Sequence, residues 1–272
     1  MPTSKEFERF LAGHPVFTVG EAALFLDAAG THGRQLVNLL LAYHVRVGHI
    51  MRVRRGMYVT VPPGLSPSNY SPDPFLLAAK MSDDAILAYH TALEFHGRAY
   101  SMRKDITYAT GKALRSSQIG SYRFRPVSFP KPLRMKGKED YGVTKDERAG
   151  LTVRVTTLER TFVDVLDRPN ISGSWEEIWR SLESIEFFDL STVVEYALLL
   201  DNATTAAKVG YFLEQHRDAL MAKESHLEPL CNKRPRRPHY LERSKRHPGR
   251  LIQRWNLVVP ESVINRSWAE IL

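Results

Sequence analysis

The sequence predicts an α+β protein built from two domains. Strand-like and helical segments are segregated along the chain, which favours α+β over a doubly wound sheet. A proline-rich connection near residue 66 separates a short basic module from the remainder. The 272 residues are 43% hydrophobic and 25% charged, enough for two cores of ordinary composition. We expect an N-terminal domain over residues 1–65 and a larger mixed α/β domain, with a small sheet and several helices, over residues 66–272.

The N-terminal module opens with a short amphipathic helix over residues 4–13, which places Phe7, Phe10 and Leu11 against the rest of the module. A capping box formed by Thr18 and Glu21 then starts a second helix, because the two side chains satisfy its free N–H groups. Gly30 ends that helix and Thr31 caps a third. The apolar residues of this third helix recur at helical spacing: Leu36, Leu39, Leu40 and Tyr43.

A two-stranded hairpin is predicted next, because after Gly48 the hydrophobic period falls to two and a turn follows at residues 54–56. Helix, turn, helix and a hairpin with a basic tip is the layout of a winged helix–turn–helix. Between residues 28 and 63 the chain has five arginines, three histidines and no acidic residue. An acid-free run of this kind is expected of a surface that faces phosphates.

Helix–turn–helix proteins place their second helix in the major groove, with its first turn closest to the base edges. Arg34 and Asn38 lie four apart on one helix face, and these side chains suit guanine and adenine respectively. The hairpin arginines suit the DNA backbone or the minor groove. The predicted DNA-binding residues are Thr31, His32, Arg34, Gln35, Asn38, Arg52, Arg54 and Arg55. The alternatives are a small α/β domain whose basic hairpin is merely solvated, and a domain whose helices and hairpin bind protein.

A second basic stretch, residues 231–254, holds nine Lys/Arg against the single acid Glu242. Its charge of +8 equals the net charge of the whole chain, so the remaining residues sum to zero. Within it, Pro235 and Pro238 predict an extended conformation for residues 233–238, a tract that could follow a phosphate backbone, dock an acidic partner or simply be solvated. The residues of this second basic surface are Lys233, Arg234, Arg236, Arg237, Lys245 and Arg246.

The larger domain is expected to begin with two helices, the second over residues 86–97. Its strands and helices are then predicted in blocks, around a polar segment at 136–150 that is expected to be an exposed hairpin or loop. A Thr156–Glu159 capping box opens the helix that Pro169 stops. The predicted strands span 105–110, 121–129, 150–157 and 254–260, and the later helices span 158–167, 174–184, 190–200 and 203–216.

Several constellations of chemistry-bearing residues weaken on inspection. His90 and His96 lack the four-residue spacing of a helical zinc pair. Asp164 and Asp167 share a helix face, but with arginines beside them they are better explained as a salt-bridged helix surface. The single cysteine excludes an internal disulfide framework, and the chain has no glycine-rich phosphate loop. We predict no enzyme, no cofactor and no metal; a metal-dependent DNA-processing enzyme using the two aspartates is the remaining rival.

Targeting signals are not evident in the sequence. No apolar run approaches 18 residues, and the first residues resemble neither a signal nor a transit peptide. The basic 231–254 stretch lacks the amphipathic spacing of a membrane-surface helix. We therefore expect a cytoplasmic protein without a membrane partner.

A set of ordered motifs resembles the AbiE-system antitoxins, which belong to type IV toxin–antitoxin pairs of abortive infection. HPVFTVGEAA is followed by the GHIMRVRRGMYVTVPPG hairpin, then by DPFLLAAK, AYHTALEFHG, TLERTFVDVLDRP, VGYFLEQH and RWNLVVP. The resemblance covers roughly residues 14–260. Each motif alone is modest, whereas their order along the chain is specific.

The resemblance implies a bacterial antitoxin that counteracts a nucleotidyltransferase-like toxin through its C-terminal domain and provides phage defence. It also implies a transcriptional autorepressor that binds inverted repeats of operator DNA through the winged helix. No stable toxin complex is implied, and no short motif for the antitoxin activity can be transferred. The alternative is a winged-helix interaction module, or another transcription regulator without an antitoxin role.

Overall fold

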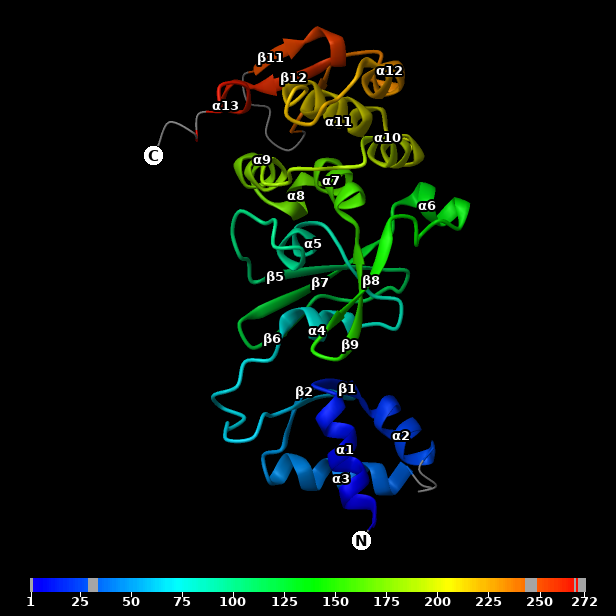
Figure 1. The fold of residues 1–272 in the computed structure, drawn as a ribbon, viewed down its shortest axis with the longest axis vertical. Coiled ribbons are helices and arrows are strands. Elements are labelled where there is room, and N and C mark those ends of the chain that lie inside the picture. Colours follow the sequence, from blue (N-terminus) through cyan, green and yellow to red (C-terminus); the bar gives the residue numbers. More distant parts are fainter. Residues whose placement is uncertain (1, 29–33, 243–248, 267, 269–272) are drawn as a thin grey trace. The chain divides into compact units, whose positions relative to one another are not determined.

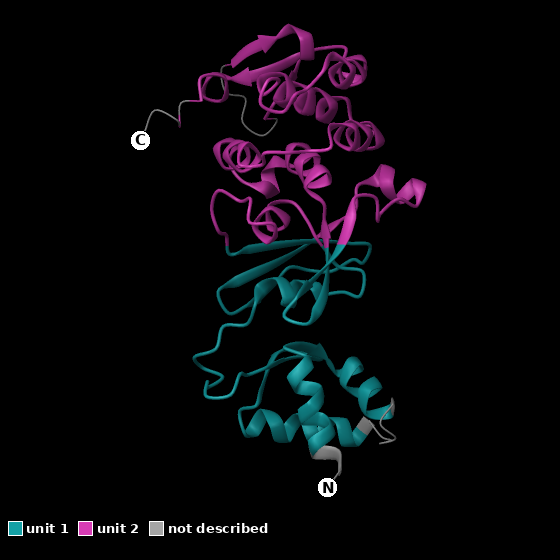
Figure 2. Ribbon diagram, viewed as in Figure 1, with its two compact units in different colours: residues 1–86, 104–126, 145–154 teal, residues 87–103, 127–144, 155–272 magenta. Residues whose placement is uncertain are grey.

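A computed structural model describes residues 2–28, 34–242, 249–266 and 268 of the chain. The fold is α+β, with helices and strands as labelled in Figure 1. The chain divides into two compact units (Figure 2). Unit 1 comprises residues 1–86, 104–126 and 145–154, and unit 2 comprises residues 87–103, 127–144 and 155–272. This division differs from the predicted boundary near residue 66, because the first unit also includes part of the following sheet.

The start of unit 1 is a small helical layer against a three-stranded sheet. Its helices are α1 (Pro2–Gly13), α2 (Val19–Ala28) and α3 (Arg34–Arg46), and its strands are β1 (Val16–Thr18), β2 (Ile50–Arg54) and β3 (Met57–Thr60). The predicted helices and hairpin are therefore present. The sequence patterns did not indicate β1, three residues that pair antiparallel to β3 in the strand order β1–β3–β2.

The core of this part is built mainly from aromatic and aliphatic side chains of α1, α2 and α3. Phe7, Phe10 and Leu11 are buried as predicted. Phe17 on β1 meets both phenylalanine rings edge-on, with ring centroids 6.5 Å and 5.0 Å apart. Aromatic pairs in this arrangement add to the stabilisation from apolar burial.

A second sheet of six strands has the order β6–β7–β5–β4–β9–β8. The chain passes between the two units within β4, β7, β8 and β9. In sequence order the elements are α4 (Pro74–Ala79), β4 (Ile86–Leu87), α5 (His90–Phe95), β5 (Asp105–Thr110), β6 (Ser117–Ile119), β7 (Tyr122–Ser128), α6 (Lys131–Lys136), β8 (Val143–Arg148) and β9 (Leu151–Thr156).

Two expectations about this region are wrong, for residues 86–97 and for the helix cap at Thr156. Residues 86–97 do not form one helix, because Ile86 and Leu87 are a buried strand parallel to β9, and Tyr89 has φ 59° before α5 begins. The polar segment at 136–150, predicted as an exposed hairpin or loop, contains the end of α6 and the whole of β8, which forms a hairpin with β9. Thr157, not Thr156, caps the next helix, accepting a hydrogen bond from the backbone N–H of Arg160 at 3.4 Å.

The remainder of unit 2 is mostly helical, with a small sheet of order β10–β12–β11. The predicted helices α7, α9, α10 and α11 are present, and α8 and α12 were not foreseen. Among the described residues, no helix has the length and apolarity needed to cross a bilayer. The elements are α7 (Leu158–Asp167), α8 (Pro169–Ser172), α9 (Trp175–Glu183), α10 (Leu190–Leu199), α11 (Ala203–Gln215), α12 (Glu224–Lys233), β10 (His239–Tyr240), β11 (Gly249–Ile252), η1 (Gln253–Trp255), β12 (Leu257–Pro260) and α13 (Glu261–Ile264).

Candidate nucleic-acid interface

Helix α3 is anchored by one buried stripe. Val37, Leu41 and His44 are 3%, 2% and 1% exposed. Successive residues of an α-helix are rotated by about 100°, so residues at these spacings point in nearly one direction. The same geometry turns Gln35, Leu39 and Arg46 to within about 30° of the opposite direction. All three are exposed, so the anchoring stripe fixes which face of α3 meets solvent.

The apolar stripe of α3 was predicted partly on the wrong side. Leu39 and Tyr43 were expected on the apolar stripe, but they are 67% and 46% exposed. The error arises because three consecutive leucines and the neighbouring valine allow more than one helical stripe, and only packing against α1 and α2 selects between them. Arg46 also lies on the exposed face, with its guanidinium carbon 5.7 Å from the centre of the Tyr43 ring.

Only some of the predicted DNA-contacting residues of this helix are described. Gln35 and Asn38 are exposed on α3. Thr31 and His32 lie outside the described residues. Arg34 begins α3, and its side chain lies outside the described part.

The three predicted hairpin arginines, Arg52, Arg54 and Arg55, are exposed. Gly56 has φ 78°, a left-handed conformation that lets the chain reverse after Arg55. Arg52 donates from Nε to the carbonyl oxygen of Arg54 at 3.4 Å, and Arg54 Nη1 lies 2.9 Å from the sulfur of Met81. A thioether is a weak, uncharged acceptor, so this contact leaves the positive charge of Arg54 unneutralised.

The start of α2 is fixed by the capping box that the sequence predicts. The backbone N–H of Thr18 donates to Glu21 at 2.8 Å, and the N–H of Glu21 donates to the Thr18 hydroxyl at 3.3 Å. Lys80 forms an ion pair with the same carboxylate. Burial alone would raise the pKa of Glu21, but the hydrogen bonds from Lys80 and Thr18 lower it overall. This acidic group is therefore neutralised by Lys80.

Two histidines meet between the end of α3 and β2. The Nδ1 atoms of His44 and His49 are 3.2 Å apart, and Nε2 of His44 is buried without a hydrogen-bond partner. Burial, and secondarily the charge of His49, lower the pKa of His44, while Glu8 opposes the shift. Because His44 is held neutral, it serves the core and not the positive surface.

The second predicted basic surface is only partly extended. Lys233 ends α12 and pairs with Asp201, and Arg234 donates to the carbonyl oxygen of Cys231 at 2.8 Å. Arg236 and Arg237 are exposed. Lys245 and Arg246 lie outside the described residues. The extended conformation predicted for residues 233–238 is wrong only for Lys233, because α12 continues to that residue despite Pro229 inside it.

The predicted salt-bridged surface on α7 is also wrong for its first pair. Arg160 and Asp164 are buried, with Arg160 Nε 3.4 Å from Asp164 Oδ2, and the Tyr196 hydroxyl donates to the same carboxyl at 2.7 Å. Arg160 also donates to the carbonyl oxygens of Glu139 and Tyr141, both at 2.6 Å. Burial raises the pKa of Asp164. This network ties the segment before β8 to α7 and α10.

His90 and Glu94 form a second buried polar pair. His90 Nε2 lies 3.1 Å from Glu94 Oε1 and 3.0 Å from the carbonyl oxygen of Ser101. The backbone N–H of Arg103 donates to Glu94 at 2.8 Å. These bonds hold the segment after α5 in place. Within the described ranges, no three His, Cys, Asp or Glu side chains are placed to hold a metal ion.

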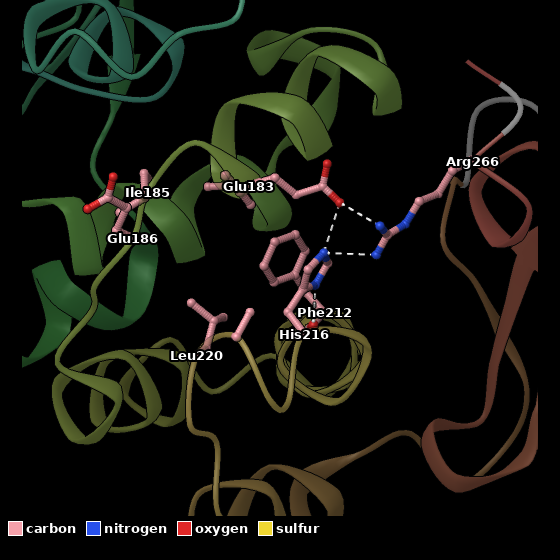
Figure 3. A pocket seen from close by; sticks show the side chains of 9 residues that line it. Glu183, Ile185, Glu186, Phe212, His216, Leu220 and Arg266 are labelled. Atoms are coloured by element: carbon pink, nitrogen blue, oxygen red, sulfur yellow. Dashed lines mark hydrogen bonds and ion pairs between the residues drawn. The ribbon is translucent and has the colours of Figure 1, made fainter. Parts of the chain in front are cut away.

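A cavity of about 460 Å³ lies in unit 2 between α9 and α11 (Figure 3). Its walls are mainly apolar, and its polar edge is a group of three paired side chains. Glu183 accepts from His216 at 2.9 Å and pairs with Arg266 at 3.2 Å, and Arg266 lies 3.0 Å from His216. Burial would raise the pKa of Glu183, but His216 and Arg266 lower it. The three groups satisfy one another.

Comparison with known proteins shows a likeness of fold. The structure is similar to the crystal structure of the Rv2827c protein from Mycobacterium tuberculosis, with a TM-score of 0.62 and 16% sequence identity. The match covers 98% of this chain and 94% of the other. No family model and no curated sequence matches the chain. At this identity the likeness concerns the fold alone.

Proposed function

We propose that residues 1–65 form a winged helix–turn–helix that binds double-stranded DNA. In this proposal α3 enters the major groove, and the β2–β3 hairpin contacts the backbone or the minor groove. The observation that carries it is that both elements of the acid-free run turn polar or basic side chains to solvent. Gln35, Asn38 and Arg46 are exposed on the helix, and the three arginines are exposed on the hairpin.

The order of elements supports the same assignment. A winged helix–turn–helix has the chain order helix, strand, helix, helix, strand, strand, which is the order α1, β1, α2, α3, β2, β3. The pairing of β1 with β3 places the short first strand beside the returning strand of the hairpin. This arrangement presents α3 and a two-stranded ribbon from one small core.

The charges around the hairpin also favour an anionic partner. Arg54 meets a sulfur atom rather than a carboxylate, so its charge remains available to a phosphate. Glu21 is paired with Lys80, so its negative charge does not oppose the arginines. Each phosphate that an arginine neutralises releases condensed counterions and strengthens binding at low salt.

We further propose, from the resemblance of the ordered motifs, that the protein is the antitoxin of a type IV system and represses its own operon. The nucleotidyltransferase-like toxin would be its functional partner, inverted repeats would be its operator, and the cytoplasm its location. We predict no catalytic activity and no cofactor. An interaction module that binds protein through α3 is the alternative, and the exposed Leu39 and Tyr43 are the observation in its favour.

Fluorescence anisotropy of labelled duplexes tests DNA binding. The probe is a duplex recovered by repeated selection from a randomised pool with the full chain, and its scrambled version is the control. We expect tighter binding to the selected duplex and a steep loss of affinity as salt rises, because phosphate contacts dominate. Failure to recover any consensus, together with salt-independent binding, would favour the protein-interaction module.

A further inference from the structure

Leu39 places a large apolar side chain, 67% exposed, at the centre of the solvent-facing side of α3. Its neighbours along that face are Gln35, one helical turn before it, and Ala42, Tyr43 and Arg46 after it; Tyr43 is 46% exposed. Leu39 is not part of the core, since the buried face of α3 is the opposite one, where Val37 and Leu41 are 3% and 2% exposed.

The residues around Leu39 indicate which kind of molecule this face binds. Single exposed leucines are common on protein surfaces and need no explanation by themselves. Here the leucine lies on an element that carries no acidic residue and is followed directly by the arginine-rich hairpin. A helix face with amide side chains, a centre formed by Leu39 and Tyr43 and an arginine beside Tyr43 fits the major groove better than an apolar protein groove. The major groove of DNA offers acceptors and donors on base edges, phosphates at its rim, and the methyl group of thymine as its apolar feature.

We propose that Leu39 determines base specificity by packing against the 5-methyl group of a thymine in the major groove. This rests on the proposed DNA-binding function and names what the face reads. Gln35, one turn earlier, suits the N6 and N7 edge of adenine. Four helical residues rise about 6 Å, close to the span of two base pairs, so the two side chains address neighbouring positions. Together they select an A·T-containing step.

The test removes only the methyl group from the DNA. Deoxyuridine pairs as thymine does but lacks the 5-methyl, so each thymine of the selected duplex is replaced in turn and affinity is measured with the full chain. Burying one methyl group is worth about a fourfold change in affinity. We expect one replacement per half-site to weaken binding about fourfold, and Leu39→Ala to bind more weakly while no longer distinguishing the two duplexes.

Leu24 provides the matched control, because it is 71% exposed on α2 and lies outside α3. Leu24→Ala should keep both the affinity and the methyl discrimination of the unchanged protein. Both leucines are exposed, so neither variant should perturb folding, which circular dichroism verifies.

Each contrary result overturns something different. Specific binding to the selected duplex with equal affinity for every deoxyuridine version overturns the role of Leu39 but leaves DNA binding intact. A protein that is dimeric in solution and becomes monomeric on Leu39→Ala, with unchanged methyl discrimination, assigns the leucine to a second copy of the chain. Failure to select any duplex overturns the proposed function and this inference together.

Discussion

Arg34, in the first turn of α3, is predicted to contact the base edge of a guanine. An arginine paired to guanine O6 and N7 is worth about 1–3 kcal/mol of discrimination. We expect Arg34→Ala to weaken binding to the selected duplex by about this amount and to leave binding to a scrambled duplex nearly unchanged. Anisotropy titrations with both duplexes measure the difference. Equal losses on the two would assign Arg34 to a phosphate.

His44 gives the N-terminal core a predictable response to pH. Its pKa is lowered by burial and by His49, so below about pH 6.5 the unfolded chain binds a proton that the folded chain resists. Stability associated with His44 is therefore present above that pH and lost as the pH falls through it. The loss is at most about 1.4 kcal/mol per pH unit.

The pH prediction is checked with His44→Phe, which keeps an aromatic ring beside Phe7 and removes the titrating group. Denaturant unfolding followed by circular dichroism at pH 7.5 and pH 5.5 should show a smaller pH dependence in the variant. His96→Gln serves as the comparison, since His96 is bonded to the Thr156 carbonyl outside this core. An identical pH dependence in His44→Phe and the unchanged protein would contradict the assignment.

Among the secondary-structure elements, the β2–β3 hairpin allows the most direct electrostatic test of DNA binding. Removing Arg54 and Arg55 should reduce the slope of log affinity against log salt by about 0.9 for each phosphate that the protein no longer neutralises. The double variant Arg54→Ala/Arg55→Ala is compared with Arg123→Ala, an exposed arginine on β7. The slopes are measured by titrations between roughly 50 and 200 mM salt. A slope unaffected by the double change would separate the hairpin from DNA.

Helix α11 depends on one glycine that packs directly against an indole ring. A Cβ added at Gly210 would lie 2.1 Å from Trp255, whose Nε1 donates to Glu214 at 2.6 Å. We expect Gly210→Ala to destabilise the protein by about 1–3 kcal/mol, because overpacking moves the ring and strains its hydrogen bond. Gly13→Ala, where the added Cβ meets nothing within 4 Å, is the control in a thermal unfolding comparison. Equal melting temperatures would show that the indole shifts at little cost.

Sequence patterns predicted the elements better than their boundaries and faces. Long periodic segments such as α10 and α11 are present as expected, and Thr18 and Glu21 form the predicted capping box. Short buried segments were misassigned, because two consecutive apolar residues such as Ile86 and Leu87 fit a helix or a strand equally well. Their place between β5 and β9 makes them a strand. The predicted apolar stripe of α3 failed for a related reason, since packing selected Val37 and Leu41 among several adjacent apolar residues.

For the candidate interface, the sequence composition located the basic elements but did not predict which side chains are exposed and which are paired. The exposure of Arg52, Arg54 and Arg55 agrees with the prediction from the sequence. The contact of Arg54 with Met81 and the pairing of Lys233 with Asp201 join residues far apart in sequence. No local pattern encodes such contacts. The burial of Arg160 and Asp164 was missed in the same way, because their helical spacing equally suits a surface pair.

For the whole molecule, we propose that DNA binding and antitoxin activity reside in different parts of the chain. A full-length variant carrying Arg34→Ala, Arg54→Ala and Arg55→Ala should lose operator repression, because its positive surface is removed. The same variant should still rescue growth when a neighbouring nucleotidyltransferase-like gene is expressed. Reporter repression and growth are measured in the same strain, with Arg123→Ala as the control. Loss of rescue in a folded variant would mean that the two activities share one surface.

Hydrogen–deuterium exchange of the full chain with and without the selected duplex tests the central claim most directly. The backbone amides of α3 and of the β2–β3 hairpin should exchange more slowly when the duplex is bound, and a scrambled duplex at equal concentration should protect them less. Protection confined to residues outside 17–62, or no change in α3 and the hairpin at saturating duplex, would contradict the account.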